Sequence, residues 1–338
     1  MKTDARIDWI DHARAIGICL VVLGHTAGLP AYAMQLIYSF HMPLFFFISG
    51  YLLKPEYLQL SPAGYLGRLW RTLVVPYIGF WLISFVYWLL SHNYVLNPEQ
   101  YAGVEILDLF NGFLFGTGDP EHSLYIINVD LWFFTCLFST CILYYLLRKI
   151  LPGSLYGGAI ILLGTIGLFS SSLWGTRLPW NLDVAGVALV FYGFGQLIRN
   201  IKIPPKTLLG VGSLIILPAW VYLVLLNGMV DMNTLQFGNG GLFYLNAIAG
   251  IVIILAIARL LPASSLSRWL SSNTIVIFPT HQLMFSVFNG ISVRLLGLPT
   301  DFKFTLLASG VFTLLAIACS FPLAIVLRRF TPWLIGER

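Results

Sequence analysis

Residues 11–50 read DHARAIGICLVVLGHTAGLPAYAMQLIYSFHMPLFFFISG, a stretch that predicts two apolar helices joined by a short Gly/Pro loop. Arg14 and His25 lie eleven residues apart on the first of these helices. That spacing is close to three helical turns, so both side chains point from one face, about 16 Å apart along the axis. Ionisable groups inside a membrane span usually face an interior cavity and mark a working site. The stretch therefore predicts a polar path through much of a bilayer, with a cation at one end and an imidazole near the other.

The composition is that of an integral membrane protein. Of the 338 residues, 58% are apolar and 10% are charged, whereas soluble domains carry about 25% charged residues. The formal net charge of +5 does not indicate a nucleic-acid-binding protein, because polytopic membrane proteins need basic residues at their cytoplasmic helix ends. No polar stretch is long enough to form a soluble domain, so residues 1–338 are expected to form a single transmembrane domain.

Apolar runs of about 20 residues predict an all-α bundle of about ten membrane-spanning helices. The runs are 9–28, 32–53, 66–91, 124–150, 153–173, 181–199, 206–228, 241–262, 270–292 and 303–330. With the N-terminus in the cytoplasm, all Lys and Arg residues except Arg177, Arg294 and Lys303 lie on the cytoplasmic side, and so do both termini. The longest outer loop contains a short apolar piece, 104–116, that predicts an interfacial helix or a re-entrant lid.

Four histidines lie within the predicted spans: His12 near the start of the first span, and His25, His41 and His281 farther inside. His25 is near the outer end of the first span and His41 lies some way into the second from the same side, so the two are expected to approach each other. A membrane histidine often serves as a hydrogen-bonded strut between helices, but an imidazole also suits a general base because it titrates near neutrality. His281 follows Pro279 near the middle of the ninth span, where a structural role and a role in the site are equally open. Ordinary surface positions are expected for His12, His92 and His122.

The cations near the cytoplasmic side have two interpretations each. Arg14 can be an anchor that extends to the surface and pairs with Asp11, or it can line a cavity mouth and bind a phosphate group. Arg68 and Arg71 open the third span, where a plain membrane anchor is the simpler interpretation and a phosphate-binding rim is the alternative. Ser49 allows close helix packing or opens a cavity wall.

Two segments place an aspartate beside a tryptophan at the outer start of a span. NVDLWFF (128–134) contains Asp130 and Trp132, and LPWNLD (178–183) contains Trp180 and Asp183. Tryptophan at a membrane interface is common and needs no function. A carboxylate at that depth seeks a partner or water, so the two aspartates are candidates for a site.

The spacing Arg14-x10-His25 resembles the Arg-x10-His signature of the membrane-bound acyltransferase 3 family, and FHMPLFFFISGY (40–51) resembles the second signature of that family. The form with His41 is similar to the branch described as fucose 4-O-acetylase-like. The resemblance covers essentially the whole chain. It implies that His25 is catalytic, that His41 supports it, and that Arg14 contributes to catalysis and binds the acyl-CoA donor, with acetyl-CoA expected.

The resemblance extends to later segments. The family carries a similar basic stretch before Pro-Tyr, which in RLWRTLVVPY (68–77) implies a donor-binding rim. The donor-binding residues implied in this way are Arg14, Ser49, Arg68 and Arg71. The two Asp-Trp segments and NTIVIFPTHQLMF (273–285) also resemble family positions. They imply an acceptor-side cavity lined by Asp130, Trp132, Trp180, Asp183 and His281.

Two classes of function follow. The first is an O-acyltransferase of the bacterial inner membrane, most simply an O-acetyltransferase, that moves an acyl group from cytoplasmic acetyl-CoA to a sugar hydroxyl on the outer face. His25 would be the general base or would carry the acyl group. The second is a secondary transporter or exporter of a small anion or lipid-linked sugar with a proton relay. It is disfavoured because the sequence has no inverted repeat and no paired broken helices.

The expected partners are the lipid bilayer and a glycan or lipid-linked sugar acceptor. No nucleic acid is expected, and no metal site is expected because no Cys/His metal-ligand spacing occurs. The sequence leaves the oligomeric state open.

Overall fold

The structure is a computed structural model that describes residues 7–92, 103–119, 122–199, 201 and 206–337. Within these residues the regular secondary structure is helical, and the β-pairing consists of two isolated bridges, Asp119–Leu124 and Asp231–Gln236. The prediction of an all-α fold is confirmed.

The helices follow one another along the chain as the apolar runs predict. The first group is α1 (Asp8–Gly24), α2 (Ala31–Tyr38), α3 (His41–Leu52), α4 (Pro55–Leu58), α5 (Pro62–Leu69), α6 (Val75–Ser91), α7 (Ile106–Phe115) and α8 (Trp132–Ile150). The second group is α9 (Tyr156–Leu168), α10 (Ser170–Trp174), α11 (Leu182–Arg199), α12 (Lys206–Asn227), α13 (Gly240–Leu260), α14 (Ser265–Arg294) and α15 (Leu306–Phe330). A π-helical turn, Trp70–Val74, joins α5 to α6, and short 3-10 turns are Val129–Leu131, Pro179–Asn181, Thr300–Phe304 and Pro332–Ile335.

In the described part of the chain, 8 helical segments are long and apolar enough to cross a membrane. They are Ala31–Leu52, Pro62–Ser91, Val129–Ile150, Pro179–Arg199, Gly210–Asn227, Gly240–Leu260, Ser265–Arg294 and Leu306–Phe330. The two other predicted spans correspond to shorter helices, α1 with 17 residues and α9 with 13 residues. The protein is therefore a multi-pass helical membrane protein in which every predicted apolar run contains a helix.

The two ends of the described chain meet at one end of the bundle. Asp8, at the start of α1, has its Oδ1 atom 4.0 Å from an Arg268 guanidinium nitrogen at the start of α14. Arg328, near the end of α15, donates a hydrogen bond of 3.1 Å to the Ser272 carbonyl oxygen of the same α14 turn. This proximity agrees with termini on one side of the membrane. The assignment of that side to the cytoplasm stays a prediction.

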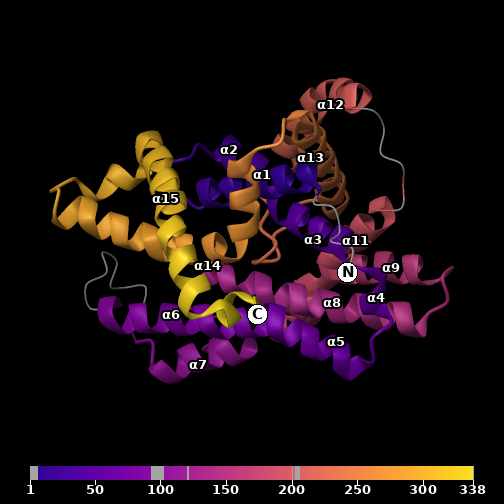
Figure 1. The fold of residues 1–338 in the computed structure, drawn as a ribbon, viewed down its shortest axis with the longest axis horizontal. Coiled ribbons are helices and arrows are strands. Elements are labelled where there is room, and N and C mark those ends of the chain that lie inside the picture. The colour runs from indigo at the N-terminus through magenta and orange to yellow at the C-terminus, as the bar shows by residue number, and fades with distance from the viewer. Residues whose placement is uncertain (1–6, 93–102, 120–121, 200, 202–205, 338) are drawn as a thin grey trace.

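Helix α1 lies in the middle of the bundle and packs against α3, α13, α14 and α15 (Figure 1). Its most deeply buried side chains are Ala13, Ile18, Val21 and Val22. The prediction that His12 lies at the surface is wrong, because its side chain is 2% exposed and its Nδ1 atom lies 3.0 Å from the Ala258 carbonyl oxygen. Because α1 is covered by protein on several sides, its polar residues Asp11 and His12 are buried within the bundle.

The predicted second span, 32–53, divides into α2 and α3. Proline in a helix clashes with the carbonyl group four residues earlier but is tolerated in a first turn. Pro43 therefore disfavours a helix that continues through Ser39, and it occupies the first turn of α3 instead. The break leaves Tyr38 at the end of one helix and His41 at the start of the next. Their rings pack edge to face, with centroids 4.8 Å apart.

Helices α3 and α11 bring their backbones into close contact. A Cβ atom at Gly50 would overlap the Tyr192 carbonyl oxygen, and one at Gly195 would overlap the Phe47 carbonyl oxygen. Small residues permit this approach, which is typical of packed membrane helices. The Gln196 side chain donates a further hydrogen bond to the Gly50 carbonyl oxygen. The contact fixes α3, and with it the position of His41.

We expect Gly50→Ala to destabilise the protein by about 1–3 kcal/mol, because the added methyl group must push two helices apart. Thermal unfolding in detergent measures the loss. Gly67→Ala is the matched control, since no atom lies within 4 Å of a Cβ added at Gly67 of α5. That variant should match or slightly exceed the parent, because alanine favours a helix over glycine. Equal melting temperatures for Gly50→Ala and the parent would contradict the close contact.

The apolar piece 104–116 forms α7, which begins with a capping box between the Glu105 and Asp108 side chains and the backbone. Its Phe113 ring lies 4.4 Å, centroid to centroid, from the Trp81 ring of α6. Figure 1 shows α7 alongside α6 at the edge of the bundle. The helix that the sequence predicts here is confirmed.

Candidate functional site

Two histidines from distant parts of the chain meet in the middle of the bundle. His25 ends α1 as its C-terminal cap, and His281 lies in α14 two residues after Pro279. The Nε2 atom of His281 lies 3.1 Å from the Nδ1 atom of His25. His281 is completely buried. The sequence predicted a pair between His25 and His41, whereas the direct hydrogen-bond partner of His25 is His281.

A buried aspartate completes this cluster. Asp130, in the turn before α8, places Oδ1 3.7 Å from Nε2 of His25 and Oδ2 3.5 Å from Nδ1 of His281. Its side chain is 1% exposed. These distances are long for hydrogen bonds but short for the attraction between a carboxylate and an imidazolium. We call His25, Asp130 and His281 the histidine–aspartate cluster.

Asn128 forms hydrogen bonds with the segments that carry the cluster. Its side-chain amide nitrogen donates to the Pro279 carbonyl oxygen at 2.6 Å and to the Ser84 hydroxyl at 3.0 Å. Its side-chain oxygen accepts a hydrogen bond of 3.2 Å from the backbone N–H of Asp130. The Asn128 side chain therefore connects α6, α14 and the turn that carries Asp130. The sequence analysis missed this residue, although it opens the segment NVDLWFF.

Hydrogen bonds to the helix backbone indicate the tautomers of the cluster. Nδ1 of His25 lies 2.9 Å from the Val21 carbonyl oxygen, and Nδ1 of His281 lies 2.7 Å from the Phe278 carbonyl oxygen. A carbonyl oxygen only accepts, so each Nδ1 is assigned the ring hydrogen. The single Nδ1–H group of His25 is then shared between two acceptors, the Val21 carbonyl oxygen and the Nε2 atom of His281. The Nε2 atom of His25 retains a lone pair on the side of Asp130.

His41 lies nearby but does not bond to the cluster. Its Nδ1 atom lies 2.9 Å from the Ile37 carbonyl oxygen. Tyr38 lies between the two histidines, with ring centroids 4.8 Å from His41 and 6.0 Å from His25. The predicted approach of His25 and His41 therefore takes place through an intervening tyrosine ring.

One cavity, the histidine cavity, joins these groups and has a volume of about 200 Å³. Its lining is His25, Tyr38, His41, Met42, Val129, Asp130, Trp132, Asp231, Met232, Asn233 and Phe278. Four predicted site residues thus share a cavity: His25, His41, Asp130 and Trp132. The sequence analysis missed Tyr38 and Asp231, and no local pattern distinguishes them from other polar residues at helix ends and in loops.

A second cavity, the Arg14 cavity, has a volume of about 210 Å³. Arg14 and Ser49 both line it, and Arg14 donates a hydrogen bond of 2.8 Å to the Thr274 hydroxyl. The other lining residues are mostly aliphatic and aromatic: Ile18, Phe45, Ile48, Leu52, Thr72, Leu73, Phe133, Phe134, Leu137, Ile275 and Phe278. The cavity is a narrow, largely apolar space with a guanidinium group in its wall.

The two cavities are separate in this structure, and Phe278 lines both of them. The Phe278 ring packs against Phe133 with centroids 5.3 Å apart. The continuous polar path between Arg14 and His25 that the sequence predicts is therefore absent here. Phe278 of α14, which is packed against Phe133 of α8, lies at the boundary between the two cavities.

Arg68 and Arg71 lie beside the Arg14 cavity without lining it. The Arg68 guanidinium carbon lies 4.0 Å from the centre of the Tyr57 ring. Arg71 is exposed and donates a hydrogen bond of 3.3 Å to the Gly67 carbonyl oxygen. Thr72 and Leu73 follow Arg71 in the π-helical turn and line the cavity, whereas Arg68 belongs to α5.

Trp180 and Asp183, predicted to line the acceptor cavity, belong instead to a structural network. Asp183 is 3% exposed and accepts from Nε of Arg177 at 2.8 Å. Arg177 also donates to the Asn233 carbonyl oxygen at 2.7 Å. Trp180 has a left-handed backbone, with φ of 56°, and its indole nitrogen donates to the Leu114 carbonyl oxygen at 3.1 Å. Neither residue lines the histidine cavity, the Arg14 cavity or a third and larger cavity that also contains His25.

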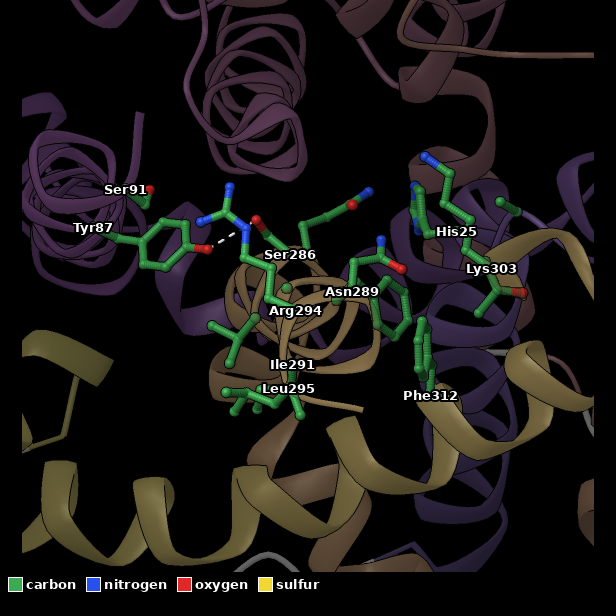
Figure 2. A pocket seen from close by; sticks show the side chains of 16 residues that line it. His25, Tyr87, Ser91, Ser286, Asn289, Ile291, Arg294, Leu295, Lys303 and Phe312 are labelled. Carbon is green, nitrogen blue, oxygen red and sulfur yellow. Dashed lines mark hydrogen bonds between the residues drawn. The ribbon is translucent and has the colours of Figure 1, made fainter. Parts of the chain in front are cut away.

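The largest of these three cavities, the Arg294 cavity, has a volume of about 570 Å³ and also contains His25 in its wall (Figure 2). Its lining comes mainly from α14, with Tyr87 and Ser91 of α6 opposite and Lys303 and Phe312 beyond the end of α14. His25 is therefore accessible from two cavities at once.

The histidine–aspartate cluster has the donor types of a metal site. One ligand atom from each of His25, Asp130 and His281 lies within 4.8 Å of the others. Two imidazoles and a carboxylate suit Zn²⁺ or Fe²⁺. The ring nitrogens nearest Asp130 are Nε2 of His25 and Nδ1 of His281, whereas the bond between the two histidines joins the other nitrogen of each ring.

Comparison with known proteins identifies the family to which the chain belongs. The chain belongs to the acyltransferase 3 family: the model of that family, described as an acyltransferase domain, matches residues 7–329. The protein is thus a membrane-embedded member of an acyltransferase family. It is similar to the inner membrane protein YcfT of Escherichia coli strain K12, with 26% identity over 322 residues, which cover 83% of this chain and 80% of YcfT. No solved structure matches the chain. Assignment to the fucose 4-O-acetylase-like branch stays a prediction.

Proposed function

We propose that this protein is an O-acetyltransferase of the bacterial inner membrane. It takes the acetyl group from cytoplasmic acetyl-CoA and transfers it to a hydroxyl group of a cell-surface glycan or lipid-linked sugar on the outer face. The observation that carries the proposal is the position of His25, which lies 3.1 Å from His281 and contributes to two cavities. Membership of an acyltransferase family and similarity to an inner membrane protein support it.

In the proposed reaction His25 acts as the general base. Its Nε2 atom accepts the proton of the acceptor hydroxyl while the hydroxyl oxygen attacks the carbonyl carbon of the thioester. The carbon–sulfur bond breaks as the ester bond forms, and His25 returns its proton to the leaving thiolate. The products are the acetylated acceptor and free CoA. In the second route Nε2 of His25 attacks the thioester carbonyl carbon and the carbon–sulfur bond breaks, which gives acetyl-imidazole and the CoA thiolate. The acceptor hydroxyl then attacks the acetyl carbon, the carbon–nitrogen bond breaks to regenerate the imidazole, and the hydroxyl proton passes to the thiolate.

The neighbours of His25 support this role. The hydrogen bond from Nδ1 of His25 to the Val21 carbonyl oxygen fixes the tautomer that leaves Nε2 free. His281, held by the Phe278 carbonyl oxygen, limits rotation of the His25 ring. The carboxylate of Asp130 stabilises the imidazolium that forms when His25 takes up the proton. Asp130 and His281 are thus proposed as positioning and charge-stabilising residues.

On the donor side, the Arg14 cavity is the proposed site of the CoA arm. Its narrow apolar wall suits a pantetheine chain, and a guanidinium group suits a phosphate or an amide oxygen. The thioester must pass Phe278 to reach His25, because this side chain lines both cavities. Rotation of the Phe278 ring is therefore part of the proposed route.

The direct test compares surface glycans and lipid-linked sugars of cells with and without the protein by mass spectrometry. The expected result is loss of one acetyl group per modified sugar when the protein is removed. Binding of acetyl-CoA to the purified protein in nanodiscs separates the enzyme from the alternative of a transporter. A protein that binds no acetyl-CoA but shows uptake driven by a proton gradient would reject the acetyltransferase.

We expect Arg14→Gln to raise the KM for acetyl-CoA about tenfold to a hundredfold, because it removes a charged hydrogen-bond donor from the proposed donor site. The effect on kcat should be smaller. Initial rates with labelled acetyl-CoA in nanodiscs measure both constants.

Arg329→Gln serves as the control for this variant. Arg329 is exposed at the end of α15, on the side of the bundle where the chain ends meet, and makes no contribution to the Arg14 cavity. The Arg329→Gln variant should leave the KM for acetyl-CoA unchanged. An Arg14→Gln protein with the parental KM, or equal changes in the two variants, would assign Arg14 to membrane anchoring only.

A further inference from the structure

The Arg294 cavity has an unusual charge. Among the described residues that line it, two are cations, Arg294 and Lys303, and none is acidic. In the predicted topology only Arg177, Arg294 and Lys303 face the outer side of the membrane, where Lys and Arg are depleted. Arg177 is used in the ion pair with Asp183. Arg294 and Lys303, the two other outward cations, both line the Arg294 cavity, which also contains His25.

The rest of the lining provides neutral hydrogen-bonding groups. Gln282, Ser286 and Asn289 follow one another at helical spacing, so they lie on one face of α14. Opposite them, the Tyr87 hydroxyl donates to the Ser286 hydroxyl at 2.8 Å, which fixes this part of the wall. Hydroxyl and amide side chains of this kind match the hydroxyl groups of a sugar.

Figure 2 shows how the charged and neutral groups are arranged. The side chains of Ser286, Asn289 and Arg294 extend from the same side of α14, and Lys303 and His25 line another part of the same cavity. A ligand that occupies this cavity would therefore meet neutral donors, two cations and the imidazole of His25 together.

We propose that this cavity selects an acceptor that carries an anionic group, a phosphate or a carboxylate, close to the hydroxyl that is acetylated. The inference rests on the proposed function and adds the class of acceptor to it. Guanidinium and ammonium groups bind both anions through charge-assisted hydrogen bonds. The neutral side chains bind the sugar, and the cations orient its hydroxyl toward His25.

The anionic group has two sources with the same chemistry. It is either the phosphate of a lipid-linked or phosphorylated sugar or the carboxylate of an acidic sugar. The planar guanidinium of Arg294 binds either in a bidentate manner, whereas Lys303 acts as a point charge. Comparison of phosphorylated and carboxylated probes distinguishes the two sources.

The experiment measures the binding of three probes to the purified full-length protein in nanodiscs: methyl glucuronide, glucose 1-phosphate and methyl glucoside. We expect the parent to bind at least one charged probe about tenfold or more tightly than methyl glucoside, with the preference falling as salt rises. Arg294→Gln and Lys303→Gln should each reduce that preference about tenfold, whereas Arg294→Lys should keep part of it. Lys149→Gln, an exposed cation at the end of α8, is the matched control and should change nothing.

The outcomes separate this inference from the proposed function. Binding of the charged probes that equals binding of methyl glucoside, or a preference that survives both glutamine variants, overturns the anionic acceptor. Thermal unfolding in detergent identifies a variant that has lost its fold. In that case the salt dependence of the parent decides: a preference for charged probes that does not fall as salt rises overturns the anionic acceptor. A clear preference for charged probes in a protein that transfers no acetyl group rejects the acetyltransferase and keeps the anion site. Acetylation of neutral glycans alone keeps the acetyltransferase and rejects the anionic acceptor.

Discussion

Replacement of His25 by alanine is expected to lower kcat for acetyl transfer by about 10³-fold or more, the range seen when a general base is removed. The imidazole is the group that contributes to both the histidine cavity and the Arg294 cavity. Its Nε2 atom is the proposed acceptor of the hydroxyl proton. Transfer of labelled acetyl groups by membranes that contain equal amounts of the protein measures the effect.

The control for this variant is His92→Ala. His92 makes the same type of bond as His25, from Nδ1 to a carbonyl oxygen four residues earlier in its helix, at 3.0 Å. It lines none of the three cavities described above, so its replacement should leave turnover unchanged. Treatment with EDTA should also leave the parent active, since the proposed reaction uses no metal. Turnover by His25→Ala, or loss of activity with the chelator, would remove His25 from the role of base.

Asp130→Asn should lower kcat by 10²- to 10³-fold with little change in either KM. Two unit charges about 4 Å apart attract by about 4 kcal/mol at the effective dielectric constant of a protein, which is on the order of 10³ in rate. The Oδ1 atom of Asp130 lies 3.7 Å from Nε2 of His25, where the positive charge develops. Asparagine retains the shape of the side chain and removes the charge.

Asp183→Asn offers a stringent comparison for Asp130→Asn. Both aspartates are buried, and each lies within three residues of a tryptophan at the predicted outer start of a span. Asp183 bonds to Arg177 rather than to a histidine. The Asp183 variant should therefore lower the melting temperature and leave kcat per folded molecule intact. A large loss of kcat in folded Asp183→Asn protein would restore Asp183 to the acceptor site, and parental kcat in Asp130→Asn would remove Asp130 from the reaction.

The fold could be predicted from the sequence to a large extent. Every predicted apolar run contains a helix in the described residues, and the short piece 104–116 forms α7. The division of the second predicted span into α2 and α3 was missed, although Pro43 contains the signal. Two of the predicted runs contain shorter helices than expected, α1 with 17 residues and α9 with 13 residues.

The candidate site could be predicted in part. The sequence placed Arg14 and Ser49 at one end of the molecule, and each lines the Arg14 cavity. It placed His25, His41, Asp130 and Trp132 at the other end, and they share the histidine cavity. Trp180 and Asp183 were selected by the same Asp-Trp pattern as Asp130 and Trp132, but their contacts lie elsewhere.

The sequence by itself determined that this is a multi-pass helical membrane protein with ionisable groups on its first helix. These properties are local: hydropathy adds along a segment of about 20 residues, and the helical repeat fixes which side chains share a face. Only the tertiary structure decided that His281 is the partner of His25, that Asp130 rather than Asp183 faces them, and that Phe278 separates the two cavities. Such contacts join residues more than 100 positions apart, and they depend on which helices pack together, which no local pattern encodes.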